Sequence, residues 1–453
     1  MASRYGRGLH NAFWEREMTY TIGRVHRRRW LCTLMTGAAA GLVTACRPMQ
    51  GPVQATPGAG SEAPVQLTYL HQWSPTQGHG PATERLVSRF REEFPTIQIE
   101  AVYTPQYYEK LVSLIAGGSL PDIATYNMAF LPRLVRLEVT VPLEPLAQST
   151  RRFDKNDMVP AAREMVTFEG KIMAMPYVVN NTGMAYNQTL FRQKGLDPSR
   201  PPQTWEELVE FGRRLTGAAD GVETWGMLFP RGAADPISPL LSFVWQNGGE
   251  VVDLARRVAT WNSPAGVEAL QFMVDLVHRY RIAPLQGGNA HLEGRVGMWV
   301  IPPGNISALG MSVGQQFAWA TAELPRGKQQ ATSLGGHALV VMKTGRAHEH
   351  AWRFVHWFIQ PANLAEYNAT TTAPAWRSVE QQPVWQRYLR EEPRMQPFVA
   401  MLAYGRPTPK LATWQEITDI LVEAREAAVR QEKTPKDALD DAARQAEPLI
   451  KSG

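Results

Sequence analysis

The pattern of apolar and polar residues becomes regular at Val65 and predicts alternating strands and helices from there on. Residues 65–70 and 97–102 alternate with a period of two, which is typical of strands. Residues 82–94 and 107–116 instead carry apolar side chains at helical spacing, and Pro95 and a Gly-Gly pair follow them. A short apolar strand is expected near residues 122–126. Strands that alternate with helices predict an α/β fold built around βαβ units.

Residues 1–45 have the layout of a cleavable secretory signal, because a basic run at 24–29 precedes an apolar stretch over 30–45. That stretch is shorter than the about 20 apolar residues that a membrane span needs. Its end, Val43-Thr44-Ala45-Cys46, resembles a bacterial lipobox, in which the cysteine is lipidated and becomes the first residue of the mature protein. The alternative is an ordinary signal followed by an ordinary cysteine.

The mature chain is therefore expected outside the cytoplasm, attached to the cell membrane by lipid on Cys46. Residues 46–64 are rich in Pro, Gly and Ala and predict a flexible tether. The basic run followed by Trp30-Leu31 also resembles a twin-arginine export signal, and a general secretory signal is the alternative. The chain starts at Met1 or, if the first residues are misassigned, at Met18.

Charge and cysteine content exclude several classes of function. Of the 47 basic and 42 acidic side chains, seven arginines and two glutamates lie in residues 1–45, which leaves 40 of each sign in the mature chain. A near-neutral chain without a basic, aromatic-rich tract is not expected to bind nucleic acid. The two cysteines are Cys32 and Cys46, so the body of the protein has no disulfide and no cysteine nucleophile.

Three local motifs predict details of the fold. Thr204 is expected to cap a helix start with Glu207 as its capping-box partner, which makes Trp205 a structural residue. Gly294 is expected in a left-handed conformation at the end of a helix. Gly335-Gly336 is expected at a strand start, where it lets another part of the backbone come close.

The order of short motifs resembles the family 1 extracellular solute-binding proteins, the maltose-binding-type receptors of ATP-binding cassette (ABC) importers. The resemblance covers about residues 65–450. It rests on residues 94–97 (FPTI), 116–123 (AGGSLPDI), 141–143 (VPL), 170–177 (GKIMAMPY), 185–191 (AYNQTLF), 194–196 (KGL), 201–208 (PPQTWEEL), 247–250 (NGGE), 293–298 (EGRVGM) and 333–339 (SLGGHAL).

This resemblance implies a type II periplasmic-binding-protein-like fold with two lobes, each a mixed sheet flanked by helices, and a ligand cleft between them. It places lobe 1 at residues 65–176 and 314–370, and lobe 2 at residues 177–313 and 371–450. The implied function is capture of a mono- or oligosaccharide and its delivery to a membrane permease. The protein is then a monomeric receptor without cofactor or catalytic activity.

Aromatic and polar residues at strand ends and in loops are the candidate ligand contacts, since Trp and Tyr rings suit the apolar faces of sugars. In the maltose-binding relatives, a stacking Trp stands at the position of Tyr126 and a sugar-contacting helical Trp at that of Trp414. Asn180-Asn181 marks the first crossover. Core packing is the alternative for Trp299 and Trp414. The candidates are Gln72, Trp73, Tyr126, Asn127, Tyr177, Asn181, Trp245, Asn247, Trp299, Asn305, Gly336, His337, Trp376 and Trp414.

Two other functions stay open at this point. A binding protein for glycerol 3-phosphate or another phosphorylated polyol would need two or more arginines or helix N-termini in its cleft. A surface glycoside hydrolase would need a pair of carboxylates at catalytic separation. The sequence contains no nucleophile elbow, phosphate-binding loop or zinc-protease motif. No cluster of acidic or Cys ligands accompanies His348 and His350, which indicate a polar helix start, so no metal site is expected.

Overall fold

The computed structural model describes residues 64–76, 78–150, 153–219, 221–229, 237–344, 347–370 and 372–453. The predicted signal peptide, Cys46 and nearly all of the tether lie outside these residues. The described residues form two mixed sheets with helices packed on them, which confirms the α/β class.

The first sheet has the strand order β15-β6-β14-β3-β1-β2. β1 is parallel to β2 and β3, whereas β14 is antiparallel to both β3 and β6. A further strand, β16, pairs with the beginning of β14. The strands are β1 (Val65–His71), β2 (Ile97–Tyr103), β3 (Ile123–Asn127), β6 (Met175–Asn181), β14 (Thr332–Val341), β15 (Ala373–Pro374) and β16 (Gly405–Pro407).

The second sheet has the order β13-β7-β12-β9-β8. Its strands are β7 (Gly183–Asn187), β8 (Gly217–Ala219), β9 (Val222–Leu228), β12 (Val296–Ile301) and β13 (Trp319–Ala322). Two small hairpins stand apart from both sheets, β4 (Thr167–Phe168) with β5 (Lys171–Ile172) and β10 (Val252–Asp253) with β11 (Val258–Ala259).

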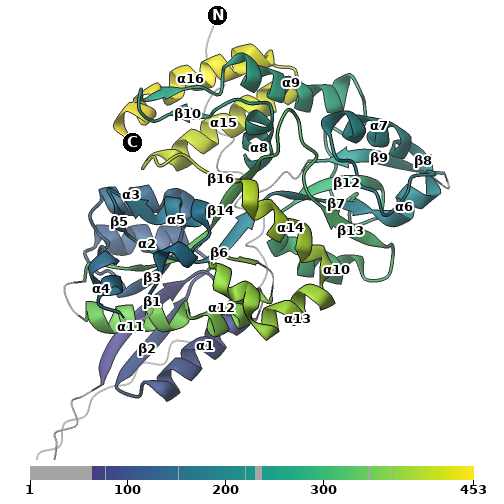
Figure 1. Ribbon diagram of the computed structural model, residues 1–453. Helices are drawn as coiled ribbons and strands as arrows, with labels where there is room; N and C mark the ends of the chain where they lie inside the picture. Colours follow the sequence, from purple (N-terminus) through teal and green to yellow (C-terminus); the bar gives the residue numbers. More distant parts are fainter. Residues whose placement is uncertain are drawn as a thin grey trace, which may run out of the picture. The chain divides into compact units, whose positions relative to one another are not determined.

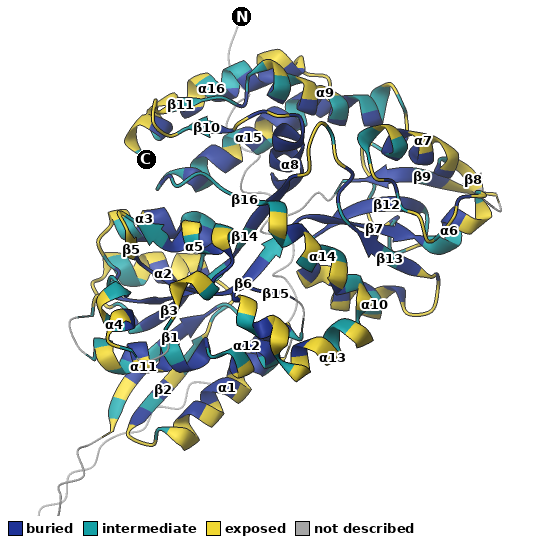
Figure 2. Cartoon of the chain, in the orientation of Figure 1, coloured by how far each residue is buried: buried dark blue, intermediate teal, exposed yellow. Residues whose placement is uncertain are grey.

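Helices cover both faces of the first sheet (Figure 1). α1 (Gly80–Glu93), α11 (His348–Phe358) and α12 (Pro361–Asn368) contact one another on one face. α2 (Tyr107–Ala116), α3 (Leu131–Arg136) and α5 (Pro160–Val166) gather on the other, and α4 (Glu144–Gln148) follows α3 in the chain. Figure 2 shows that the helices turn buried residues toward the strands, as expected of amphipathic helices.

On the second sheet, α6 (Gln188–Gln193) and α7 (Trp205–Leu215) pack against β9, β12 and β13. A separate helical group consists of α8 (Ser238–Gln246), α9 (Pro264–His278), α15 (Trp414–Val429) and α16 (Pro435–Ser452), which share one hydrophobic core. α8 also contacts β14. The other helices are α10 (Ile306–Val313), α13 (Pro383–Glu391) and α14 (Gln396–Ala400), with 3-10 turns η1 (Met128–Phe130), η2 (Lys155–Asp157), η3 (Pro303–Asn305), η4 (Arg377–Gln381), η5 (Pro393–Met395) and η6 (Met401–Tyr404).

Several local predictions are confirmed. The helix predicted over residues 107–116 is α2, and the first two predicted strands are β1 and β2. The Thr204 hydroxyl accepts a hydrogen bond from the Glu207 backbone N–H at 3.3 Å, as expected of an N-cap. The Glu207 carboxylate, however, accepts from the backbone N–H of Gln203 at 2.7 Å rather than from that of Thr204.

Two of the glycine predictions need correction. Gly294 has the expected left-handed conformation, with φ +73°, but it follows a series of turns and not a helix. Gly335 and Gly336 lie within β14, which begins at Thr332, because the first residues of that strand pair with β16. The close approach of backbone at Gly336 is nevertheless present, as described below.

The chain changes sheets near, but not at, the expected crossovers. Tyr177 lies within β6 of the first sheet, and the chain enters the second sheet after Thr182. It returns between β13 and β14, not at residue 314, since β13 still belongs to the second sheet. The third expected crossover, at residue 371, lies outside the described residues. The division into lobes at residues 176/177, 313/314 and 370/371 stays a prediction.

Candidate functional site

Polar side chains gather where β1 and β3 end. Gln72 and Trp73 directly follow β1, and Asn127 is the last residue of β3. His337 of β14 lies opposite Asn127 in the antiparallel pairing. Ligands of open α/β sheets bind at the carboxyl ends of the strands, so these residues occupy the part of the first sheet where a ligand is expected.

His337 is held by the two residues that follow β1. The Gln72 Nε2 atom lies 2.7 Å from His337 Nε2, and the Trp73 ring lies edge-to-face with the imidazole at 5.0 Å. Burial lowers the pKa of His337 to about 4. The imidazole is therefore neutral near pH 7, and it contributes hydrogen bonds to the site rather than charge.

Trp73 is fixed by a second set of contacts. Its indole N–H donates to the Tyr177 hydroxyl at 3.0 Å, and its ring is edge-to-face with His79 at 4.8 Å. The His79 ring is in turn stacked on Tyr367 at 4.8 Å, with the two planes 5° apart. Trp73 is only partly buried. The network therefore holds in a fixed orientation an indole that is still partly accessible to solvent.

Asn180 of β6 lies on the same face of the sheet as His337. It stands opposite Gly335, and His337 is two residues further along β14, where side chains return to the same face. Diagonal neighbours of this kind are about 7–8 Å apart. Among the described residues, neither the Asn180 Oδ1 atom nor the His337 Nδ1 atom has a hydrogen-bond partner, although both atoms are buried. Buried polar atoms are almost always satisfied, so these two atoms are suited to a bound molecule.

Gly336 brings β6 and β14 unusually close beside these two residues. Its φ is +144°, and a Cβ atom there would lie 2.2 Å from the Val178 carbonyl oxygen and 2.9 Å from Met128 Cε. The pairing of the two strands shifts register immediately after His337. A residue without a side chain is therefore required where the polar residues of the site converge.

The segment that follows β12 of the second sheet, η3, contacts β6. Asn305, the last residue of η3, is exposed, and Pro303 is buried. The structure thus brings together six of the predicted residues, namely Gln72, Trp73, Asn127, Tyr177, Gly336 and His337, whereas Asn305 stays a predicted contact.

Four of the predicted tryptophans belong to the hydrophobic core instead. Trp245 and Trp414 lie in the shared core of α8, α9, α15 and α16, each 2% exposed. Trp299 is 3% exposed and lies beside the His291 ring at 5.9 Å. Trp376 is also buried, and its indole N–H donates to the Pro176 carbonyl oxygen at 2.6 Å. These buried rings have no free face on which a sugar could stack. Trp299 and Trp414 are therefore core residues in this structure, which is the alternative given for them from the sequence.

The remaining three predicted residues point elsewhere. Tyr126 precedes Asn127 in the strand and faces the opposite side, where its ring meets Tyr108 at 6.0 Å and burial raises its pKa to about 12. Asn181 is buried, and its amide donates to the Phe398 carbonyl oxygen at 2.8 Å. Asn247 donates to the Glu268 carboxylate at 2.8 Å.

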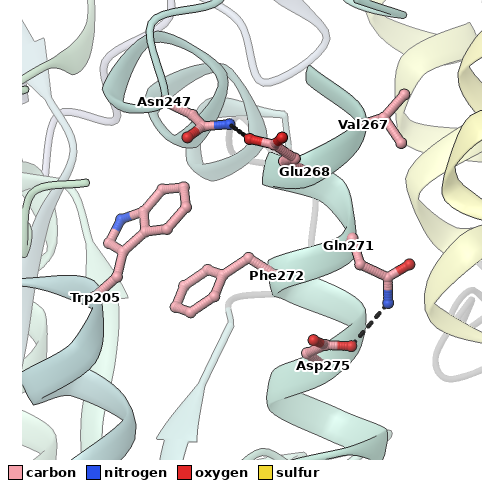
Figure 3. A pocket seen from close by; sticks show the side chains of 7 residues that line it. All are labelled: Trp205, Asn247, Val267, Glu268, Gln271, Phe272 and Asp275. Atoms are coloured by element: carbon pink, nitrogen blue, oxygen red, sulfur yellow. Dashed lines mark hydrogen bonds between the residues drawn. The ribbon is translucent and has the colours of Figure 1, made fainter. Parts of the chain in front are cut away.

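Asn247 lines a separate pocket of about 360 Å³ between α7 and α9 (Figure 3). Trp205 is stacked flat on Phe272 there, with ring centres 4.3 Å apart, and its indole N–H donates to the Gln246 side chain at 2.7 Å. The figure also shows Gln271 bonded to Asp275. Because these polar groups already have partners, the pocket is a weaker candidate than the end of the first sheet.

Sequence reasoning missed His79, Tyr367 and the role of Asn180. Of the Asn180-Asn181 pair, the sequence-based prediction names Asn181 as the ligand contact. Adjacent strand residues face opposite sides of a sheet, so only one of the two shares a face with His337. The face of each residue follows from its pairing with β14, which the sequence does not show.

The buried histidines predict a specific pH dependence of stability. Burial lowers the pKa of His71 to about 4 and that of His79 to about 3, from 6.5. The unfolded chain therefore takes up protons below pH 6.5 while the folded chain does not, so the stabilisation present above pH 6.5 is lost as the pH falls toward 4. Each such group changes the free energy of unfolding by up to about 1.4 kcal/mol per pH unit.

This dependence can be measured by urea unfolding at pH 7.5 and pH 4.5. His71→Phe removes one of these groups, and we expect the loss of stability between the two pH values to be smaller in this variant than in the unchanged protein. Equal losses in both proteins would contradict the prediction.

A model of the family described as bacterial extracellular solute-binding protein matches residues 85–391. This chain belongs to that family. The resemblance seen in the sequence motifs is thereby confirmed, and the protein is a solute-binding protein of the extracellular type. No helix in the described part of the chain is long and apolar enough to cross a membrane.

Similar proteins bind, as their names state, either a glycerol phosphate compound or a sugar. The sn-glycerol-3-phosphate-binding periplasmic protein UgpB of Pectobacterium atrosepticum is 22% identical over 427 residues, 87% of this chain and 93% of that protein. The cyclic α-maltosyl-1,6-maltose binding protein of Arthrobacter globiformis has a TM-score of 0.76 and 26% identity, covering 86% of this chain and all of that one. UgpB of Mycobacterium tuberculosis in complex with glycerophosphocholine has a TM-score of 0.73 and 21% identity, covering 86% and 98%.

Proposed function

We propose that this solute-binding protein captures a neutral carbohydrate at the end of the first sheet and delivers it to the permease of an ABC importer. The observation that carries the proposal is the pair of unpaired buried atoms, Asn180 Oδ1 and His337 Nδ1, on one face beside the partly exposed Trp73. An aromatic ring next to hydrogen-bonding groups without net charge suits a molecule with apolar C–H faces and hydroxyl edges. The maltosyl-maltose binding protein of A. globiformis is consistent with this ligand class.

A phosphorylated polyol such as glycerol 3-phosphate is the second candidate, favoured by the names of the UgpB relatives. A bound phosphate calls for arginine side chains or helix N-termini. Arg406 on β16 lies next to the beginning of β14, where it is opposite Ser333. Its guanidinium, however, already contacts both Glu250 carboxylate oxygens, at 3.0 and 2.8 Å. A phosphate would have to compete with that carboxylate.

Calorimetric titration against a panel of neutral sugars and glycerol phosphate esters distinguishes the two candidates. We expect binding of a neutral sugar with little dependence on salt, weakened by roughly 1–3 kcal/mol in His337→Ala or Asn180→Ala, because each removes a buried hydrogen bond. Arg406→Ala is the matched control and should keep this binding. Binding of a phosphate ester alone, lost in Arg406→Ala and at high salt, would contradict the carbohydrate assignment.

We also propose that Cys46 carries the lipid that attaches the protein to the outer side of the cell membrane. Each buried methylene of an acyl chain contributes about 0.8 kcal/mol, so several acyl chains hold a protein at a bilayer without a spanning helix. Expressed in a bacterium with lipoprotein processing, the protein should partition into the detergent phase, and Cys46→Ser should stay in the aqueous phase. The same aqueous partitioning of both proteins would contradict lipidation.

A further inference from the structure

The contact between Gln72 and His337 indicates which imidazole nitrogen carries the hydrogen. The Gln72 Nε2 atom lies 2.7 Å from the His337 Nε2 atom. A side-chain amide nitrogen only donates hydrogen bonds, so the imidazole Nε2 must be the acceptor. A neutral imidazole that accepts at Nε2 carries its hydrogen on Nδ1. The unpaired Nδ1 atom is thus an N–H donor.

The surroundings leave the imidazole little freedom to rearrange. Trp73 packs edge-to-face on the ring at 5.0 Å, and the Trp73 indole is itself anchored to the Tyr177 hydroxyl. The backbone next to His337 is held by Gly336, whose Cα has no room for a side chain. Burial keeps the pKa of His337 near 4, so a doubly protonated ring, which would bring two donors face to face at Gln72, does not form at neutral pH.

We propose that Gln72 is a positioning residue, which holds His337 as the Nδ1–H tautomer and thereby makes the site select a ligand oxygen that accepts a hydrogen bond at this point. Asn180 Oδ1 on the same face has the opposite requirement, because it needs a donor. A polyhydroxylated ligand meets both needs, since a hydroxyl both accepts and donates. The statement about which ligand the site selects rests on the proposed function, whereas the assignment of the His337 tautomer does not.

Nitrogen-15 NMR of histidine-labelled protein measures the tautomer directly, without any ligand. We expect the His337 signals of the unchanged protein to show protonation at Nδ1. Gln72→Glu places an acceptor opposite Nε2, so the proton should move to Nε2. Gln98→Glu is the matched control, because it adds the same charge on the neighbouring strand β2, where the Gln98 amide donates to the Pro95 carbonyl oxygen. It should leave the tautomer unchanged.

Titration with the neutral sugar identified by the panel then tests selection. Gln72→Glu should bind it about 10- to 100-fold more weakly, whereas Gln98→Glu should bind normally. Gln72→Met, which keeps the volume but fixes neither tautomer, should show a smaller loss and serves if the Glu variant does not fold.

An Nε2–H signal in the unchanged protein overturns the inference, whatever the ligand is. The inference also fails if Gln72→Glu shows the reversed tautomer but binds the sugar with unchanged affinity, provided that His337→Ala weakens binding. If His337→Ala also binds normally, the location of the ligand is wrong, and the failure then lies in the proposed function.

Discussion

Gly336→Ala is expected to destabilise the fold by roughly 3 kcal/mol or more, because a Cβ atom would lie 2.2 Å from the Val178 carbonyl oxygen at a φ of +144°. Both backbones belong to paired strands in the middle of the first sheet, so neither can move away without breaking the ladder between β6 and β14. The midpoint of urea unfolding measures the loss. Alanine adds only a Cβ atom at this position, and larger side chains should prevent folding.

Gly335→Ala is the matched control for this prediction. Gly335 is the preceding residue of the same strand, yet a Cβ atom there has no neighbour within 4 Å in the described structure. We expect its free energy of unfolding to stay within about 0.5 kcal/mol of the unchanged protein. If Gly336→Ala is as stable as Gly335→Ala, the close approach of β6 and β14 is not required by the fold.

Trp73→Ala and Trp414→Ala should have opposite effects, although both remove an indole. Trp73 is partly exposed beside the unpaired atoms of the site, so its loss should weaken sugar binding by roughly 1–3 kcal/mol with a small change in stability. Trp414 is 2% exposed in the core of the four packed helices, so its loss should lower stability by roughly 3–5 kcal/mol.

Calorimetry and thermal unfolding of both variants make the comparison. The folded fraction of Trp414→Ala should keep its normal affinity. The assignment of the site to the end of the first sheet fails if Trp73→Ala binds the sugar normally, or if Trp414→Ala stays stable and loses binding.

The sequence predicted the candidate site only in part, and the reason is visible at two strands. Gln72, Trp73 and Asn127 were found because residues that follow a strand in a βαβ unit must lie at the ligand-binding edge of the sheet. At Asn180 and Asn181 the sequence shows two identical side chains in succession. The two face opposite sides of the sheet, and the pairing with β14 decides which of them shares a face with His337; a shift of one residue in register would reverse the choice.

The tryptophans show that the sequence is equally limited in predicting which side chains are buried. The sequence places Trp245, Trp299 and Trp376 beside a predicted strand, turn or crossover, much as it places Trp73. Trp414 is a candidate because the resemblance aligns it with a sugar-contacting helical Trp. In the structure all four are nearly fully buried, whereas Trp73 is not. Burial depends on which distant segment packs on each ring, and residue type carries little information about that.

Local chemistry was sufficient for α2 and for the start of α7, because helix periodicity, Gly-Gly termination and an N-cap hydroxyl act between residues a few positions apart. The order of motifs along the chain was likewise sufficient to identify the family. The donor and acceptor set of the site was not accessible in this way. Gln72 and His337 are 265 residues apart in the chain, and their hydrogen bond exists only because β14 inserts between β3 and β6. Contacts of such long range follow from the packing of the whole sheet, and so tertiary structure alone places them.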